Sequence, residues 1–480
     1  MEKILDNEYR KQRLENMEKL KDFGYIPYNE SFERSDRLDK LQKEFEIGKS
    51  VSGCGRIVTI RKMGKMAFAH INDGFGKFQI MVKKDVIGDN AFNAFKLLDI
   101  GDIIGVDGSY FLTQTKENTI AISSWKLLSK SLLPFPEKFH GLSDQETRYR
   151  QRSLDLISNL ETVSLFKNRT KIIKEIRSYL DNNDFMEVET PMLQYIAGGA
   201  SAKPFKSHYN ALNTDVYLRI APELYLKRLI VGGLDRIYEM NRNFRNEGID
   251  KTHNPEFTCL EIYQAYGDMR SMQKLIKEMF LQIAESVFGR FNFTWLGHEI
   301  NLNKPWEEIT YNNLIKRHLG DNWFDKDIKT ILNEAIEKEL DVNENMSHRE
   351  ITHEIYDKII EPTLIQPTFV IELPAELVPL ANYSNNDKSL VDVFELIIGG
   401  KEIAPAYSEL NDPIEQRLRL EKQSKDDMSK LDEDFLKALE YGMPPTGGMG
   451  IGIDRLIMLF TGSDSIKDVI LFPQLKPKND

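Results

Sequence analysis

Five short runs rich in β-branched and aromatic residues follow one another between positions 49 and 133. Turn signals such as Asp73-Gly-Phe-Gly76 and Asp107-Gly108 separate these runs. Five strands in so short a stretch suit a small barrel of the OB-fold type. The predicted strands are Val51–Ile60, Met66–Asn72, Lys77–Val82, Asp102–Phe111 and Thr119–Leu128.

The residues before the barrel, 1–48, form a charged segment in which we expect helix. Leu14, Met17 and Leu20 recur there at three-residue spacing and make one apolar stripe among charges. Two interpretations stay open for this helix. Either it packs on its own domain with its charged face in solvent, or its charged face contacts RNA.

After the barrel, Pro134-Phe-Pro136 predicts a stiff linker over residues 134–145. From residue 146 to 480 helices and strands alternate, beginning with a long amphipathic helix over 162–182. Regularly spaced parallel βαβ repeats are absent and hairpins dominate, which favours an antiparallel sheet flanked by helices. Residues 270–360 are more helical and charged, and look like an insertion. The expected fold class is therefore α+β: a barrel, then an antiparallel sheet with helices.

The segment 235–266 predicts a strand, a polar loop and a second strand. Side chains alternate faces along a strand. One face of the second strand therefore carries Phe257, Cys259, Glu261 and Tyr263, and the other face is apolar. An aromatic ring, a carboxylate and a phenol on one surface are typical of a binding site.

The loop of this hairpin carries Arg245, Glu247 and His253. Arginine is suited to bidentate contact with phosphate, so the loop is a candidate phosphate site. The alternative is a solvated hairpin with unrelated charges.

A second hairpin is predicted where Gly399-Gly400 joins two β-rich runs. The two-residue turn places Ile397 opposite Glu402, so Glu395 lies diagonally across from Glu402 on the same face. Two carboxylates on one surface suit Mg²⁺ that also holds substrate phosphates. Unrelated surface glutamates are the alternative.

Glycines recur at period two in Gly448, Gly450 and Gly452 and would leave one strand face bare for a flat ring. A helix is expected to start near Asp454, with Arg455 at its N-terminus, where anions are favoured. The spacing is neither the dinucleotide fingerprint nor a P-loop. Glycines at a bulge are the alternative.

On the barrel, Arg61, Phe68 and Gln79 fall on neighbouring predicted strands. A nucleic-acid base can stack on Phe68 while the other two offer hydrogen bonds. The alternative is that Phe68 is an ordinary core residue.

Several classes of protein are disfavoured. The charged start lacks an apolar signal core, and the longest apolar runs are far shorter than the roughly 20 residues of a membrane span. Cys54 and Cys259 are far apart, which disfavours a disulfide framework or zinc site and fits the cytoplasm. The net charge of −11 argues against a general nucleic-acid binder, although local basic patches can still hold RNA.

Together these segments resemble the three motifs of the class II aminoacyl-tRNA synthetases, and the preceding barrel is typical of their lysine, aspartate and asparagine subgroup. The matching motifs are Glu187-Val-Glu-Thr-Pro191, Phe244-Arg245-Asn-Glu247 with Phe257, and Gly450-Ile-Gly452-Ile-Asp-Arg455. Longer segments are similar to the bacterial-type lysyl-tRNA synthetases: His140–Arg150, Gly198–Ala200, Tyr217–Arg228, Arg242–Gly248, Ser408–Asp412 and Asp468–Pro473.

The resemblance implies ATP-dependent activation of L-lysine as an adenylate, then its transfer to tRNA(Lys), with Mg²⁺ as cofactor. It also implies a cytoplasmic homodimer joined near Pro191 and no membrane association. Arg245 and Arg455 would be catalytic. The implied ATP-binding residues are Arg245, Glu247, His253, Phe257 and Arg455. The implied lysine-binding residues are Gly199, Glu223, Glu261, Tyr263 and Glu409. Glu395 and Glu402 would bind magnesium, and Arg61, Phe68, Gln79 and Glu117 would bind the anticodon.

This chain departs from the lysyl family at Pro405, where Asn is usual, and at Asn382, where a basic residue is usual. Both departures predict an altered contact with the substrate carboxylate. Strand parity counted from Glu402 would also point Glu409 away from the pocket, so we expect a bulge or strand end near residues 404–406.

Three alternatives stay open: an aspartate or asparagine ligase of the same subgroup, a synthetase-related enzyme that attaches lysine to protein, and a non-catalytic RNA-binding homologue. An acidic pocket disfavours the first, the barrel disfavours the second, and retention of Arg245, Glu395, Glu402 and Arg455 disfavours the third.

Overall fold

The structure is a computed structural model that describes residues 8–135, 142–200, 202–424 and 431–477. The chain divides into two compact units, residues 1–163 and 164–480. Residues 1–7 of the predicted N-terminal helix and residues 136–141 of the predicted linker lie outside the described ranges. Within those ranges no helix is both long and apolar enough to cross a membrane.

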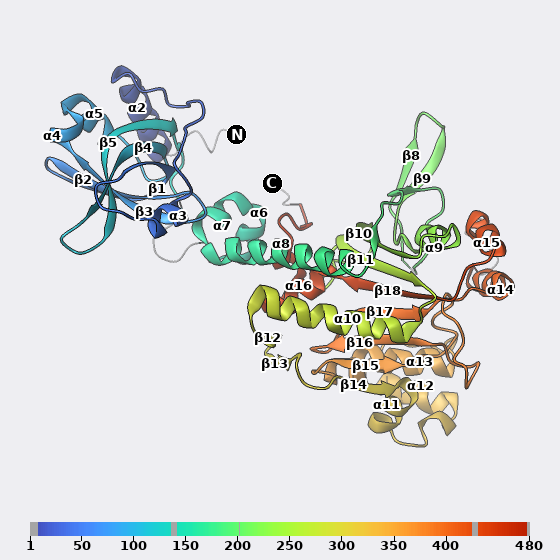
Figure 1. Ribbon diagram of the computed structural model, residues 1–480. Helices are drawn as coiled ribbons and strands as arrows, with labels where there is room; N and C mark the ends of the chain where they lie inside the picture. The colour runs from blue at the N-terminus through green and yellow to red at the C-terminus, as the bar shows by residue number, and fades with distance from the viewer. Residues whose placement is uncertain (1–7, 136–141, 201, 425–430, 478–480) are drawn as a thin grey trace. The chain divides into compact units, whose positions relative to one another are not determined.

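Five strands of the first unit close into a barrel in the order β1-β2-β3-β5-β4 (Figure 1). Alternate side chains such as Ile57, Ile71, Ile80 and Ile120 fill its interior. The predicted barrel and its five strands are therefore confirmed. Their bounds are β1 (Ser50–Met63), β2 (Met66–Asn72), β3 (Lys77–Lys83), β4 (Ile103–Leu112) and β5 (Asn118–Ser129).

The helix predicted through residues 1–47 is interrupted, because the chain turns after Asp22 at Gly24, whose φ is +85°. The first of its helices packs on the barrel: Leu20 joins the barrel core, and the buried Arg13 guanidinium donates to the carbonyl oxygen of Ile100. The helices of this unit are α2 (Glu8–Asp22), α3 (Leu38–Lys43), α4 (Lys84–Ile87), α5 (Asp89–Phe95), α6 (Gln145–Arg150) and α7 (Arg152–Ser158).

The second unit is built on an eight-stranded sheet in the order β14-β15-β16-β17-β18-β11-β10-β6. Its central strands pair antiparallel, and only the outer pairs β14–β15 and β10–β6 are parallel. The expected α+β class is therefore confirmed. The strands are β6 (Met186–Glu187), β10 (Arg236–Phe244), β11 (Glu256–Ala265), β14 (Glu307–Thr310), β15 (Thr368–Ile371), β16 (Val393–Ile398), β17 (Lys401–Ser408) and β18 (Thr446–Gly452).

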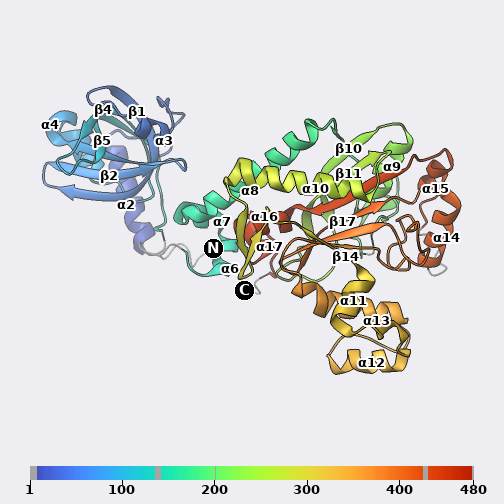
Figure 2. The same cartoon turned by 60° about the horizontal axis from the view of Figure 1, so that its bottom comes forward.

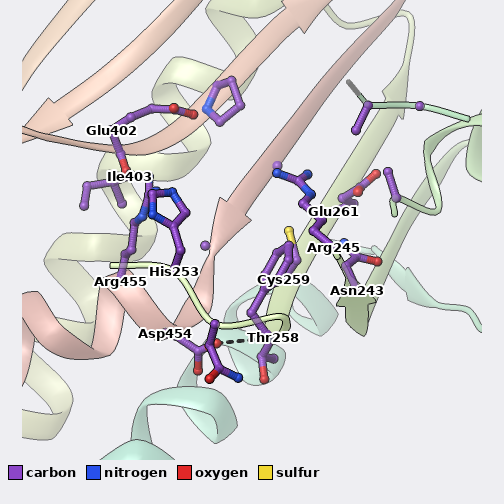
Figure 3. Close-up of a pocket in the computed structure, with 18 of the residues that line it drawn as sticks. Asn243, Arg245, His253, Thr258, Cys259, Glu261, Glu402, Ile403, Asp454 and Arg455 are labelled. Carbon is purple, nitrogen blue, oxygen red and sulfur yellow. Dashed lines mark hydrogen bonds between the residues drawn. The ribbon is translucent and has the colours of Figure 1, made fainter. Parts of the chain in front are cut away.

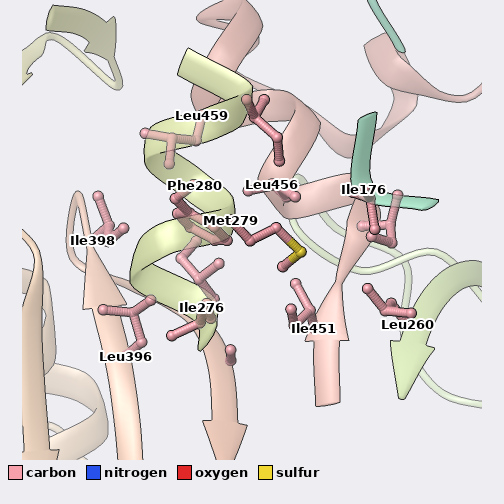
Figure 4. Packing of buried hydrophobic residues seen from close by; sticks show 14 of the residues in the cluster. Ile176, Leu260, Ile276, Met279, Phe280, Leu396, Ile398, Ile451, Leu456 and Leu459 are labelled. Carbon is pink, nitrogen blue, oxygen red and sulfur yellow. The ribbon is translucent and has the colours of Figure 1, made fainter. Parts of the chain in front are cut away.

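Three helices cover one face of this sheet: α8 (Leu160–Asp181), α10 (Met269–Ile283) and α16 (Ile453–Thr461). Figure 4 shows their side chains meeting those of the strands in one apolar cluster. Met279 and Phe280 of α10 and Leu456 of α16 are fully buried there against Leu260 and Ile451. Burying a large apolar side chain stabilises the fold by about 1.5–3 kcal/mol, so packing fixes this face of the sheet.

The remaining elements border the sheet. Helices α11 (Tyr311–Leu319), α12 (Ile328–Glu337) and α13 (His348–Ile355) gather over β14–β16, where Val370 and Ile397 join a second apolar cluster (Figure 2). The other strands and α-helices are β7 (Leu193–Gln194), β8 (Lys206–Tyr209), β9 (Thr214–Leu218), α9 (Glu223–Val231), β12 (Asn292–Trp295), β13 (His298–Asn301), α14 (Pro413–Ser424), α15 (Glu433–Glu440) and α17 (Ile466–Val469). Short π-helices are η1 (Ala284–Phe288) and η3 (Tyr356–Ile360), and short 3-10 helices are η2 (Trp323–Asp325) and η4 (Glu361–Thr363).

The β16–β17 hairpin has the predicted register, with Ile397 opposite Glu402 across a Gly399-Gly400 turn. Both glycines have positive φ, +61° and +68°. The pairing then shifts by one residue, because Leu396 faces Ala404, so Ile403 is an additional residue in β17. The bulge expected near residues 404–406 is thus present one residue earlier.

Candidate active site

A pocket of about 460 Å³ opens on the sheet face opposite α10. Strands β11, β17 and β18, the loop after β10 and the start of α16 supply its walls. Figure 3 shows Arg245 and Glu261 on one side, and His253, Glu402 and Arg455 on the other. Of the residues predicted from the sequence, those lining it are Gly199, Glu223, Arg245, Glu247, His253, Phe257, Glu261, Tyr263, Glu402 and Arg455.

Strand β11 divides its side chains as predicted. Phe257, Glu261 and Tyr263 line the pocket, whereas Leu260 and Ile262 are fully buried in the core beneath it. One face of β11 thus packs into the core, while side chains of the other face line the pocket.

Arg245 lies at the turn between β10 and β11, where its amide donates to the Pro255 carbonyl oxygen at 2.9 Å. Its guanidinium carbon is 5.1 Å from the centre of the Phe257 ring, a cation–π distance. Its buried Nε has no hydrogen-bond partner among the described residues. Because the Arg245 guanidinium and the Phe257 ring are held together, they can bind an anionic group and a flat ring side by side.

Strand β18 presents the bare face predicted from its glycines. A Cβ added at Gly450 would meet no atom within 4 Å, and Gly450 and Gly452 both line the pocket. Gly448 differs, because a Cβ there would clash with Oε1 of Glu409 and lie 2.7 Å from Cε1 of Tyr263. The glycines thus open one wall of the pocket and let Glu409 approach the strand closely.

Arg455 lies in the first turn of α16, as predicted, and reaches across the pocket mouth. Its Nη1 donates to the Glu402 carbonyl oxygen at 2.7 Å, and its Nη2 is 3.2 Å from Nε2 of His253. Nδ1 of His253 is 2.8 Å from Oδ2 of Asp250, which fixes the ring. Two nitrogen-rich side chains beside a helix N-terminus make this mouth suitable for an anion.

Glu402 lines the pocket, and Glu395 lines an adjoining hollow of about 880 Å³ that Glu402 also borders. Burial and the neighbouring Glu402 raise the pKa of Glu395 well above its ordinary value. Oε2 of Glu395 accepts from the Tyr356 hydroxyl at 2.8 Å, and Glu361 accepts the Glu402 amide at 3.2 Å. In the described ranges no group of three or more His, Cys, Asp or Glu side chains is arranged to hold a metal ion.

The floor of the pocket is acidic, because Glu223 and Glu261 line it and the buried Glu409 lies behind it, next to Tyr263. Glu223, Glu261 and Glu409 are each less than 10% exposed. The Tyr263 hydroxyl donates to Oε2 of Glu261 at 3.1 Å. Burial, reinforced by Glu223, raises the pKa of Glu261 to about 8, and burial also raises the pKa of Glu409. Carboxylates held this way favour a cationic ligand group, because a cation restores their charged form.

Glu409 does not line the pocket directly. It follows the last residue of β17, and its amide donates to the Thr446 carbonyl oxygen at 2.8 Å. The bulge at Ile403 reverses strand parity, so Pro405 and Tyr407 face the pocket while Ala404 and Ala406 enter the core. The same reversal turns Glu409 towards Tyr263 and Gly448 rather than away.

Sequence reasoning missed Lys227. Its side chain is completely buried, and its Nζ lies 2.7 Å from Oε1 of Glu223 and 2.5 Å from Oε2 of Glu409. Part of the signal was available, because Glu223 and Lys227 stand four residues apart on one helix face. The second contact, to Glu409, comes from a distant strand and has no local signal.

On the barrel, Arg61 pairs with Phe68 across β1 and β2, and Gln79 lies on β3. Nε2 of Gln79 donates to Glu117 at 2.7 Å, and Glu117 also contacts Nε2 of His70 at 2.9 Å. Phe68 is half-buried rather than a core residue, and Arg61 is exposed. Arg61, Phe68 and Gln79 therefore lie on the adjoining strands β1–β3, and Glu117, directly before β5, contacts both Gln79 and His70 on the same barrel surface.

Comparison with known families gives two matches. A family model of class II tRNA synthetases (D, K and N) matches residues 144–476. A model of OB-fold nucleic acid binding domains matches residues 51–128, which is the barrel.

Individual relatives are similar over almost the whole chain. The lysine–tRNA ligase of Carboxydothermus hydrogenoformans is 48% identical over 482 residues, which is 98% of this chain and 99% of that protein. That of Pelotomaculum thermopropionicum is 49% identical, over 98% of this chain and 96% of its own. That of Staphylococcus epidermidis is 46% identical, over 98% and 99%.

The glycine wall gives a stability test that needs no ligand. Gly448→Ala would force Glu409 and Tyr263 to move, and we expect it to lower the free energy of unfolding by about 1–3 kcal/mol. The matched variant Gly450→Ala adds the same methyl group to open space and should change stability far less. Urea unfolding of both variants checks this, and equal losses would contradict the placement of Glu409.

Proposed function

Because the chain belongs to the class II tRNA synthetases of the aspartate, lysine and asparagine group, we propose that it joins L-lysine to tRNA(Lys) in an ATP-dependent reaction. The observation that carries the choice of lysine is the acidic floor of the pocket. Glu261 and Glu409 would attract an ammonium group and repel the side chain of aspartate. The pocket thus disfavours the aspartate and asparagine alternatives.

The first step forms lysyl-adenylate. A lysine carboxylate oxygen attacks the α-phosphorus of ATP, the bond from that phosphorus to the bridging oxygen breaks, and pyrophosphate leaves. Negative charge develops at the α-phosphate, and Arg245 would neutralise it through a guanidinium that already stacks on Phe257. The adenine ring would lie between Phe257 and the bare face at Gly450.

Arg455, His253 and Glu247 would position ATP and its outgoing pyrophosphate, with the cationic Arg455 facing the outer phosphates. Arg455 and His253 meet at the pocket mouth, and Glu247 lies on the same loop as His253. Since the attacking carboxylate is already ionised, the step needs no general base. Orientation and charge neutralisation would supply its acceleration.

Mg²⁺ fits the pair Glu395 and Glu402. Both present hard oxygen ligands, and the buried Glu395 has an elevated pKa that a cation would lower again. When bound, the ion would supply positive charge that offsets the charge of the ATP phosphates. Tyr356 would hold the Glu395 carboxylate in place through its hydrogen bond.

The amino acid would lie between Gly199 and the acidic floor. Gly199 has a φ of +84°, and an added Cβ would lie 3.1 Å from that of Glu223, so this loop packs tightly on the start of α9. Gly199 and Glu223 would bind the α-amino group, and Glu261, Tyr263 and Glu409 the ε-ammonium. In the second step the 3′-terminal ribose hydroxyl of tRNA attacks the lysyl carbonyl carbon and AMP leaves.

We assign the barrel, residues 49–133, to anticodon binding and residues 146–480 to catalysis, with the helical segment 1–48 before the barrel and the linker 134–145 after it. The stretch 270–360, expected to be an insertion, contains α10 and β14 and therefore also builds the sheet and its core. Arg61, Phe68, Gln79 and Glu117 would contact the bases. We also propose a cytoplasmic homodimer joined near Pro191, a stretch where Met186, Met192 and Leu193 are about half exposed.

The direct test is ATP–pyrophosphate exchange with each of the twenty amino acids. We expect exchange with lysine and little with the others, because only lysine offers a long side chain ending in ammonium. Arginine is the informative comparison, since it carries the same charge on a larger group. Exchange driven by aspartate or asparagine would contradict the proposal.

Removing one magnesium ligand tests the metal site. Glu402→Gln should slow adenylate formation at least tenfold, about 1.4 kcal/mol in the barrier, and extra Mg²⁺ should restore part of the rate. The control is Glu299→Gln, an exposed glutamate of β13 far from the pocket in sequence, which should behave like the parent. Unchanged exchange by Glu402→Gln at limiting Mg²⁺ would exclude Glu402 as a ligand.

Truncating Phe68 tests the barrel. Losing one base stack should weaken tRNA binding by about 1–3 kcal/mol, so Phe68→Ala should reduce aminoacylation but spare tRNA-independent exchange. Phe75→Ala, at another exposed phenylalanine of the barrel, is the matched control. If both reactions fell equally for Phe68→Ala, the defect would lie in folding instead.

A further inference from the structure

We propose that Lys227 is a positioning residue for amino-acid recognition, whose ammonium joins Glu223 and Glu409 and sets the charge that the pocket offers to the substrate. The proposal rests on the proposed function, because those two carboxylates are the ones assigned to the two amino groups of lysine. It concerns a residue that touches neither the substrate nor the reacting atoms.

The geometry is that of a closed ion cluster. Nζ of Lys227 lies 2.7 Å from Glu223 and 2.5 Å from Glu409, and the Lys227 side chain has no exposed surface. Burial alone would lower the pKa of Lys227, but the two carboxylates raise it above its ordinary value. The residue is therefore a permanent cation beneath the pocket floor.

The cluster joins two parts of the chain that are far apart in sequence. Glu223 and Lys227 belong to the first two turns of α9, whereas Glu409 follows β17. Oε1 of Glu409 has no hydrogen-bond partner among the described residues and lies against the bare face of Gly448. Lys227 thus holds one oxygen of Glu409 and leaves the other directed towards the glycine strand and Tyr263.

The charges balance only when Lys227 is included. Glu223, Glu261 and Glu409 bring three negative charges when ionised, and Lys227 reduces the sum to two. Lysine brings two ammonium groups, so the occupied floor is neutral, while Arg245 is left to meet the substrate carboxylate and the phosphate. Buried charges without partners are strongly disfavoured, so this balance affects how readily the buried Glu261 and Glu409 ionise.

Replacing Lys227 with an uncharged residue would leave three carboxylates for two ammonium groups. The pKa of Glu409 would then rise further, because a buried carboxylate without its cation prefers the neutral form. At neutral pH the variant would offer protonated carboxyl groups to the substrate, and lysine would bind less tightly.

The pH dependence has a definite sign. The groups acting on Glu261 are Glu223, Glu239, Tyr263 and Arg245, and those acting on Glu409 are Lys227 and Glu223. Bound ammonium favours the ionised carboxylates, so lysine should bind more tightly as the pH rises from 6 to 8.5 through the elevated pKa values. In a variant without Lys227, the midpoint of this pH-dependent increase in lysine affinity should lie at higher pH.

The test is Lys227→Met, which keeps the length of the side chain and removes its charge. We expect the KM for lysine in ATP–pyrophosphate exchange to increase about tenfold or more at pH 7, with the KM for ATP nearly unchanged. The pH midpoint of lysine binding should move up by about one unit. Lys227→Gln, whose amide can still donate to one carboxylate, should lie between the parent and Lys227→Met and serves if the latter folds poorly.

The barrel provides a matched control. Lys130 is likewise completely buried between two carboxylates, Asp99 and Asp102, at 2.6 and 2.9 Å. Lys130→Met should lower the melting temperature but leave the KM for lysine and its pH profile unchanged. If Lys227→Met and Lys227→Gln also lowered only the melting temperature, Lys227 would be merely structural and the proposal would be wrong. Failure of the proposed function is separate, since the parent protein would then show no lysine-dependent exchange.

Discussion

The alternation of side chains along β11, β17 and β18 governs where the groups that these strands contribute to the pocket lie. One face of these strands is held by the helices α8, α10 and α16, and its side chains have no freedom to turn. Everything on the opposite face is therefore directed into the pocket with the precision of a packed core. Precise placement matters for a reaction that depends on orientation and charge neutralisation, because small displacements of the reacting groups cost much of the rate.

A strict alternation of side chains along β17 would nevertheless not have built this site. In the proposed function Glu402 faces the phosphates and Glu409 the amino acid, yet the two stand seven positions apart, and a regular strand would point them to opposite faces. The additional residue at Ile403 resolves this conflict by shifting parity once. Pro405 is tolerated next to the bulge because β17 pairs with β18 only from Ala406 onwards, so the missing amide breaks no bond to that neighbour.

Much of this could be predicted from the sequence because its signals are local. Alternating runs identified the five barrel strands, the Gly399-Gly400 pair fixed the hairpin register, and the glycines of β18 indicated an open wall. The continuous helix expected through residues 1–47 was wrong in its middle, since Gly24 and Pro27 end the first helix. Contacts between distant segments gave no such signal: the hydrogen bond from the Glu402 amide to Glu361 could be found only in three dimensions.

Burial of charge links the two halves of the pocket. On the side proposed to bind the nucleotide, cationic groups would face the phosphates, and Arg245 there lies over the Phe257 ring. The amino-acid side is its electrostatic opposite, with carboxylates whose pKa values burial has raised. A ligand that carries ammonium groups at one end and phosphates at the other satisfies both sides at once. Lysine and ATP together form such a ligand while they react to give lysyl-adenylate.

The fully buried Lys227 binds two of the three carboxylates. It therefore reduces the electrostatic repulsion among these carboxylates while the pocket is empty. The selectivity of the pocket for lysine and the stability of its acidic floor therefore depend on the same ion cluster. A change in one of these properties also changes the other.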